Sequence, residues 1–194
     1  MRKISKLVIC SLLPVIISLG CVNIKTEQSS EELLRSSERR ASHIRRSWAQ
    51  KLKQASPVDM VMLLLDHYDF VTNQYIDFGY DNVERWKEGE SGRDEKISGN
   101  EMRTYIDQWI TIQKPVLTAY DDNFEYAYEQ IKHAGYFRSD FLELLLKLLD
   151  NYYLVYSVTM FPKGSPNDYA YQLEKTKYEK EIIADQLKEA VEKY

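Results

Sequence analysis

Apolar side chains recur every three or four residues along the chain, which is the period of an amphipathic helix. In the segment that begins near residue 56, this repeat is carried by Val61, Leu64, Leu65, Tyr68, Val71, Tyr75 and Ile76. The following segment carries it at Met102, Tyr105, Ile106, Trp109, Ile112, Val116, Tyr120, Phe124, Ala127 and Ile131. No segment shows the strict alternation of a half-buried strand. The pattern therefore predicts an all-α fold.

Five helix starts can be placed from the residues that cap helices. They fall at Ser29, Ser56, Ser98, Ser139 or Asp140, and Ser165. Two of these serines precede a glutamate by three residues, which is the capping-box spacing, and two others directly precede a proline. Gly135 marks the end of the helix before the fourth of these starts. Caps and periodicity together predict a single antiparallel bundle of about five helices.

Two features predict how this bundle is arranged. Pro115 falls inside the apolar repeat of the third helix, where it removes a backbone donor and clashes with the preceding turn. Because the repeat continues beyond it, we expect the helix to kink there and not to break. The fourth helix, about residues 140–160, is apolar almost all round. A helix of that kind is expected at the centre of a bundle.

The first 21 residues differ in character from the rest of the chain. Arg2, Lys3 and Lys6 form a short basic start, and residues 7–19 carry no charge. As a helix, this uncharged run rises about 20 Å, which is less than the roughly 30 Å of a bilayer core. A basic start followed by a short apolar run is typical of a signal peptide and not of a membrane span.

The residues that close this run are Ser18, Leu19, Gly20 and Cys21. They resemble the lipobox of bacterial lipoproteins, in which the cysteine is acylated and becomes the mature N-terminus. Gly20 and Cys21 fit that pattern. Ser18 and Leu19 depart from it, since the family usually has a larger aliphatic residue at the first position and a smaller residue at the second. The resemblance covers only this N-terminal stretch.

The resemblance implies three parts of the chain and a location. Residues 1–20 would be the signal peptide, residues 21–28 the acylated N-terminus with a short tether, and residues 29–194 the helical domain. Cys21 would then hold the exported protein on a bacterial membrane, because two or more acyl chains anchor stably. Val22 stands where an aspartate favours inner-membrane retention in enteric bacteria, so the resemblance favours the outer membrane, facing the periplasm.

Net charge excludes one class of partner. The whole chain has a formal net charge of −4, and the first 20 residues contribute three basic residues and no acid, so the remainder carries −7. Nucleic-acid binding depends on a basic surface that faces the phosphates. We therefore expect no nucleic-acid partner.

Motifs of the common enzymes and metal sites are missing from the sequence. It contains no Gly-x-Ser-x-Gly elbow, no His-Glu-x-x-His pair and no glycine-rich phosphate loop after a strand. Asp66 and His67 are adjacent, and adjacent residues point in different directions on a helix. Asp121 and Glu125 share a helix face, but any acidic helical protein offers such pairs. We expect no metal, no cofactor and no catalytic residue.

The first predicted helix is strongly basic. Its arginines are Arg35, Arg39, Arg40, Arg45 and Arg46, and a narrow apolar seam runs beside them. A basic helix beside a lipid anchor could lie on anionic headgroups, which attract it by about 1 kcal/mol per basic residue. In the alternative interpretation, which we favour, the seam packs on the acidic remainder of the domain.

Tyrosine is in excess, with 15 residues in the chain. Its side chain combines a large apolar body with a polar tip, which suits binding interfaces. Tyr120, Tyr126, Tyr128 and Tyr136 are clustered near the end of the third helix, and we take them as candidate partner-binding residues. In the alternative interpretation they line helix–helix contacts. Tyr126 and Tyr128 are two residues apart, so they cannot both point into one core.

These features favour one function and leave two alternatives open. The favoured function is that of a membrane-tethered lipoprotein whose non-catalytic helical domain binds or assembles proteins of the cell envelope. The first alternative is a lipoprotein that binds a small ligand in a tyrosine-lined pocket. The second is an enzyme without a recognisable motif.

Overall fold

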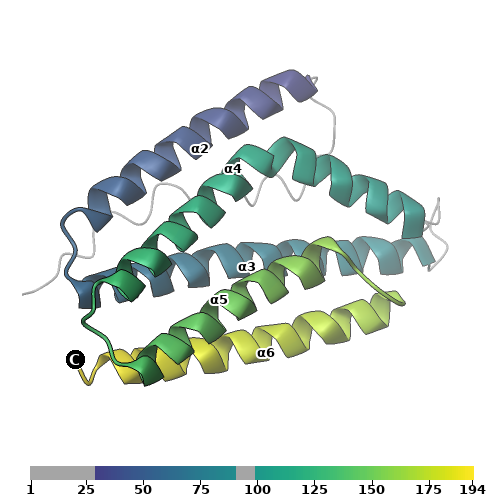
Figure 1. The fold of residues 1–194 in the computed structure, drawn as a ribbon. Coiled ribbons are helices and arrows are strands. Elements are labelled where there is room, and N and C mark those ends of the chain that lie inside the picture. Colours follow the sequence, from purple (N-terminus) through teal and green to yellow (C-terminus); the bar gives the residue numbers. More distant parts are fainter. Residues whose placement is uncertain (1–28, 91–98) are drawn as a thin grey trace, which may run out of the picture.

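The structure, a computed structural model, describes residues 29–90 and 99–194. This part of the chain forms five helices and no strand, so the predicted all-α fold is confirmed (Figure 1). The helices are α2 (Ser30–Leu52), α3 (Pro57–Glu90), α4 (Gly99–His133), α5 (Ser139–Met160) and α6 (Pro166–Val191). The predicted signal peptide, Cys21, the tether and the Ser98 cap lie outside the described residues.

Serine side chains cap three of the helices as the sequence predicted. Ser29 accepts a hydrogen bond from the amide of Glu32 at the start of α2. Ser56 accepts from the amide of Asp59 at the start of α3. Ser165 and Asp168 form a reciprocal capping box at the start of α6. These bonds satisfy amides that have no partner within the helix.

The start of α5 differs from the prediction. Its N-cap is Arg138, which makes no side-chain cap bond, so the predicted cap at Ser139 or Asp140 is wrong. The Asp140 carboxylate is engaged otherwise, since it accepts from the amide of Phe141 and from the guanidinium of Arg138. Gly135, with φ of 64°, follows the end of α4 in the left-handed region, as predicted for a helix terminator.

The helices run in alternating directions, and α3 lies at their centre (Figure 1). It packs against α4, α5 and α6, whereas α2 packs mainly on α4 and α5 pairs with α6. The predicted central position of α5 is therefore wrong. Leu146 and Leu154 of α5 are 46% and 42% exposed, because the apolar circumference of α5 exceeds what its neighbours cover.

One hydrophobic core joins all five helices. It contains Trp48 of α2, Leu64 of α3, Phe124 of α4, Leu148 of α5 and Leu187 of α6. Each large apolar side chain that is fully buried stabilises the fold by about 1.5–3 kcal/mol relative to an exposed one. The core is thus shared widely enough to position every helix against α3 or against a helix that α3 supports.

The contact between α3 and α6 combines a close approach with a buried ion pair. A Cβ atom on Gly79 would lie 2.7 Å from Leu173 Cδ2, so a larger residue there would force the Leu173 side chain to move. Further along, the ammonium of Lys180 lies 2.9 Å from Asp69 Oδ1 and is almost completely buried. A charge removed from water in this way needs its partner, so loss of Asp69 would destabilise the contact between α3 and α6.

Pro115 lies inside α4, which continues through it as one helix. The proline therefore does not split the helix. In Figure 1, α4 is bent partway along its length. The kink at Pro115 itself stays a prediction.

His67 is buried where α2, α3 and α4 meet. Its ring centroid lies 4.6 Å from that of Trp48 and 5.5 Å from that of Tyr120. Its Nε2 lies 3.1 Å from the carbonyl oxygen of Tyr120, to which the protonated nitrogen donates. Burial lowers the pKa of His67 to about 4, against a smaller opposing effect of the Tyr120 carbonyl. The ring is therefore neutral at neutral pH.

This burial predicts an acid-sensitive fold. The unfolded chain binds a proton at His67 near its ordinary pKa of about 6.5, whereas the folded chain does so only near 4. The stability that the neutral His67 ring contributes is thus fully present above about pH 6.5, and it is lost as the pH falls toward 4. We expect the free energy of unfolding in urea to be about 2 kcal/mol lower at about pH 5 than at about pH 7.5 from this residue alone.

Substitution separates this effect from that of other groups. His67→Gln should lose the 2 kcal/mol difference, whereas His133→Gln, at an exposed histidine of α4, should keep it. Equal pH dependence in His67→Gln and in the unchanged protein would contradict the assignment.

Candidate functional site

The three predicted tyrosines of α4 point in different directions. Tyr120 is half-buried against His67 and Phe70. Tyr126 is 54% exposed, whereas Tyr128 is half-buried with the ammonium of Lys132 over its ring. As the spacing required, Tyr126 and Tyr128 do not share a core. The three rings do not converge on one patch.

Tyr136, the fourth predicted tyrosine, lies after α4 at one end of the molecule. It is part of an aromatic group with Phe137, Phe141 and Tyr194. Its hydroxyl donates to the carbonyl oxygen of Tyr194. The group ties the last residue of the chain to the α4–α5 connection, so Tyr136 has a structural contact while remaining partly exposed.

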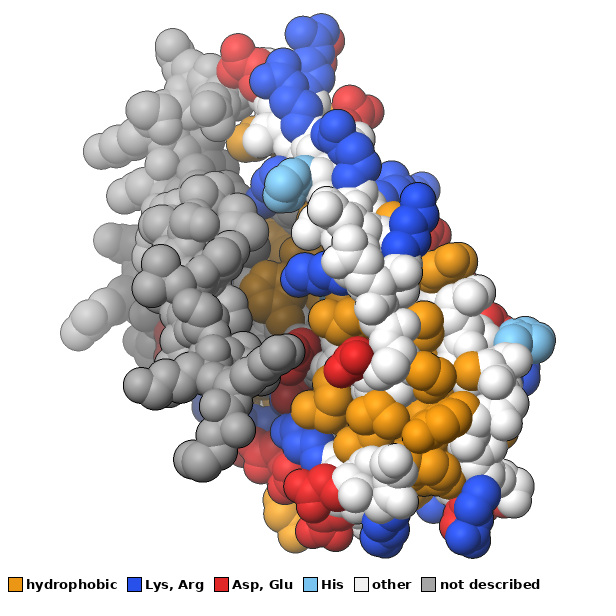
Figure 2. Space-filling view, turned by 90° about the vertical axis from the view of Figure 1, so that its left-hand side faces the viewer, with side chains coloured by type: hydrophobic (Ala, Val, Ile, Leu, Met, Phe, Trp, Pro, Cys, Tyr) orange, Lys and Arg blue, Asp and Glu red, His pale blue; other side chains and the backbone are white. Residues whose placement is uncertain are grey.

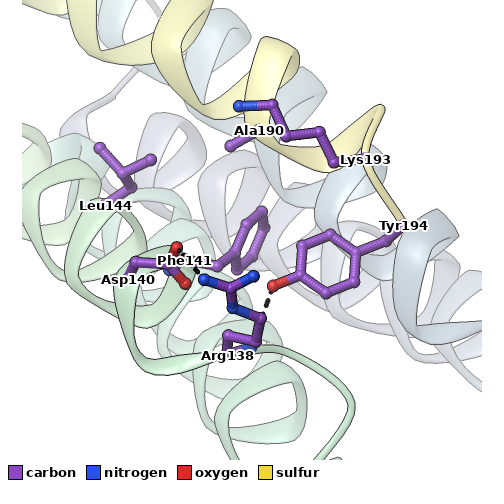
Figure 3. Close-up of a pocket in the computed structure, with 7 residues that line it drawn as sticks. All are labelled: Arg138, Asp140, Phe141, Leu144, Ala190, Lys193 and Tyr194. Atoms are coloured by element: carbon purple, nitrogen blue, oxygen red, sulfur yellow. Dashed lines mark hydrogen bonds and ion pairs between the residues drawn. The ribbon is translucent and has the colours of Figure 1, made fainter.

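A small pocket adjoins this aromatic group (Figure 3). Its volume is about 200 Å³, and it is lined by Arg138, Asp140, Phe141, Leu144, Ala190, Lys193 and Tyr194. The Tyr194 hydroxyl accepts from the Arg138 amide, and the Arg138 side chain pairs with Asp140 at 3.1 Å. Arg138, Asp140 and Tyr194 thus bind one another within the pocket. Its volume is below the roughly 300–1,000 Å³ of typical small-molecule sites.

The arginines of α2 divide into two sets. Arg40 donates to Gln113 and Arg45 pairs with Asp122, so these two side chains reach across to α4. Arg35, Arg39 and Arg46 face solvent. The seam of α2, which includes Ala41 and Trp48, is buried against α4.

A cluster of tyrosines and carboxylates bridges α4 and α5. The Tyr152 hydroxyl donates to Asp121 Oδ1 at 2.7 Å, and the Tyr153 hydroxyl donates to Glu125. Tyr156 lies one turn further along α5, and its ring packs on that of Tyr75 from α3. We call Tyr75, Asp121, Glu125, Tyr152, Tyr153 and Tyr156 the tyrosine–carboxylate cluster.

The sequence alone gave little reason to select this cluster. The i, i+4 spacing placed Asp121 and Glu125 on one helix face, but such pairs are common. Tyr152 and Tyr153 are adjacent and therefore point in different directions. They meet the two carboxylates only because α4 and α5 both rest on α3 while making few contacts with each other. That geometry is tertiary, and no local signal encodes it.

Burial governs the electrostatics of the cluster. It raises the pKa of Asp121, and the nearby Glu125 and Asp122 raise it further, while the Tyr152 hydroxyl acts in the opposite direction. Burial also raises the pKa of Tyr152 and of Tyr153. The tyrosines therefore remain protonated donors at neutral pH, and the carboxylates are their acceptors. No basic residue donates to either carboxylate among the hydrogen bonds and ion pairs of the described residues.

Exposed apolar side chains surround the cluster on α5. Leu146 and Leu149 share a helix side with Tyr153, at spacings of seven and four residues. Leu146 and Tyr153 are exposed, and Leu149 and Tyr156 are half-buried. Together with the Asp121 and Glu125 carboxylates they form a surface that is both aromatic and acidic. Such a surface suits a partner that presents apolar and basic side chains.

Within residues 29–90 and 99–194, no group of three or more histidine, cysteine or acidic side chains is arranged to hold a metal ion. No helix in that part of the chain combines the length and the apolar character needed to cross a bilayer. Comparisons with known protein families, with curated proteins and with solved structures found no match.

The raised pKa of Asp121 predicts that its charge weakens the fold. Asp121→Asn keeps an oxygen acceptor for Tyr152 and removes the charge, so the free energy of unfolding at neutral pH should rise. The gain should shrink as pH falls, because Asp121 is then protonated in both the folded and the unfolded chain. Urea unfolding followed by circular dichroism measures both effects.

Tyr152→Phe provides the comparison. It removes the donor and leaves the Asp121 carboxylate without its partner, so it should lower stability by about 1–3 kcal/mol. A loss of stability in Asp121→Asn as large as in Tyr152→Phe would contradict the proposed role of the charge.

Proposed function

We propose that this protein is an exported bacterial lipoprotein, acylated at Cys21, whose helical domain binds a protein of the cell envelope without catalysis. The observation that carries the proposal is the order of features at the N-terminus. A basic start, an uncharged run and the residues Gly20 and Cys21 are followed, eight residues after the cysteine, by the Ser29 cap of α2. The acylated cysteine would thus lie close to the helical domain, and we place the protein at the outer membrane, facing the periplasm.

The proposed binding surface is the tyrosine–carboxylate cluster with the exposed side of α5. Large aromatic side chains dominate binding energy at protein interfaces, and Tyr153 and Tyr156 supply them here. We predict that the Asp121 charge destabilises the fold, and a carboxylate of that kind would be explained if it binds a partner. The chemistry of the surface favours a partner segment with apolar and basic side chains. Tyr126, exposed on α4, is a separate candidate contact.

Processing is the first test of this proposal. The protein should incorporate a labelled fatty acid in cells, and Cys21→Ser should abolish the label because the acceptor thiol is gone. An inhibitor of the lipoprotein signal peptidase should cause an unprocessed precursor to accumulate. Normal maturation under that inhibitor, or equal labelling of Cys21→Ser, would contradict lipoprotein processing.

Partner binding is the second test. Cross-linking of the acylated protein in its own membranes should yield one dominant protein partner. Leu146→Ala plus Tyr153→Ala should reduce its yield at least tenfold, since hot-spot side chains contribute about 2 kcal/mol or more. The matched control is Tyr171→Ala plus Tyr178→Ala, which removes exposed aromatic area from α6 and should leave the yield unchanged.

Each remaining outcome points elsewhere. Equal loss in the α5 and α6 variants would place the site off the tyrosine–carboxylate cluster. Loss in Tyr126→Ala alone would place it on the outer side of α4. An anchored, abundant protein without any cross-linked partner would contradict the binding function.

A further inference from the structure

The basic residues of α2 form a solvent-facing stripe. Arg35, Arg39, Arg46 and Lys53 are separated by four, seven and seven residues, so they lie on one side of the helix and extend along about 27 Å. All four are exposed. Arg35 is paired with Glu31 at 2.6 Å, and residues 39–54 contain no acid. We call these four residues the α2 basic stripe.

The stripe lies opposite the apolar seam of α2. Because Ala41, Trp48 and Leu52 are buried in the domain, the helix has no apolar face left to insert into a bilayer. The neighbouring Arg40 and Arg45 are bound to α4. What remains for an external contact is mainly charge, on a helix at one edge of the structure (Figure 1).

The sequence that follows α2 has the opposite charge. Residues 29–54 contain seven basic and three acidic residues, a net charge of +4. Residues 55–194 contain 15 basic and 26 acidic residues, a net charge of −11. Figure 2 shows basic side chains gathered over α2 in the upper part of the view. An anionic surface would therefore attract α2 and repel the other helices.

We infer that the α2 basic stripe lies on the anionic phosphate headgroups of the membrane to which the protein is anchored. This inference rests on the proposed acylation of Cys21. The tether of residues 22–28 reaches at most about 25 Å when fully extended, so α2 is the helix held nearest to the bilayer. Its basic residues then lie within the range where anionic lipid attracts them.

The stripe fixes how the domain is oriented on the membrane. α2 lies on one side of the molecule and α6 on the other, with α3, α4 and α5 between them (Figure 1). With α2 on the headgroups, α6 faces away from the bilayer. The acidic remainder is then separated from the anionic lipid by the thickness of α2, which is about one Debye length at physiological salt.

The test uses the acylated protein in vesicles of phosphatidylcholine, with or without phosphatidylglycerol. Flotation with the vesicles first establishes the anchor, so failure at this step counts against the proposed lipoprotein and not only against the stripe. Phenylglyoxal then modifies exposed arginines, and mass spectrometry reports each site. Arg39 and Arg46 should react about fivefold or more slowly in the anionic vesicles, and Arg103 of α4 should react equally in both.

Matched variants identify the cause of the protection. Arg35→Gln plus Lys53→Gln removes two charges from the stripe and leaves Arg39 and Arg46 as reporters, so most or all of their roughly fivefold protection should disappear. Lys147→Gln plus Lys177→Gln, on α5 and α6, makes the same change in net charge and should leave the protection intact. High salt should abolish the protection, because it screens exposed charges.

Two outcomes would overturn the inference. Equal reactivity of Arg39 and Arg46 in neutral and anionic vesicles, with the protein firmly anchored, would show that the stripe does not contact lipid. Protection in native membranes but not in anionic vesicles would assign the stripe to a protein partner. Neither result would affect the acylation of Cys21, which the flotation step decides separately.

Discussion

The arrangement of this domain depends on the burial of α3 on several sides. Its side chains at Val61, Leu64, Tyr68 and Val71 are completely or almost completely buried, and α4, α5 and α6 all rest on it. Because α4 and α5 are both positioned by α3, they do not need an extensive contact with each other. The side on which they face each other is instead spanned by long side chains from the two helices. The hydrogen bonds from tyrosine hydroxyls to carboxylates on that surface follow from this constraint.

The hydroxyl–carboxylate hydrogen bonds across α4 and α5 come with an unfavourable free energy, the desolvation of a carboxylate. Tyr152 and Tyr153 each give one donor to a carboxylate, and no cation compensates the charge of Asp121 within the described structure. An apolar pair of similar shape would satisfy the fold without the desolvation of a carboxylate. By contrast, Lys180 between α3 and α6 is buried with a carboxylate directly beside it. The two sites differ because one completes a helix contact and the other remains at a surface.

Local signals in the sequence were sufficient to predict the helices. They were insufficient to predict which helices pack against each other. Ser29, Ser56 and Ser165 cap helices because their bonds involve residues only three positions away. The cap of α5 was missed because Asp140 is engaged by Arg138, a choice that spacing does not reveal. The prediction of α5 as the central helix was wrong for a related reason. The apolar character of a helix shows how much of its surface can be buried, but the helices packed around it determine how much is buried. The tyrosine–carboxylate cluster depends on the same tertiary information. Its individual residues could be noted in the sequence, but their contacts across α4 and α5 could not be predicted from it.

Charge separates the two sides of the domain more sharply than shape does. α2 carries a net positive charge, and its apolar seam is packed against α4. Packing therefore holds the helix in place, while its outward basic side chains take no part in that contact. If the seam were to face a bilayer, α4 would expose Val116 and Ala119 to water, at a cost that charge attraction alone would have to exceed. The packed arrangement avoids this conflict, because hydrophobic burial and electrostatic attraction act on opposite faces of one helix. If the domain is anchored as proposed, this division would give it a preferred orientation without any inserted helix, and the aromatic and acidic surface of α4 and α5 would be free to meet a partner.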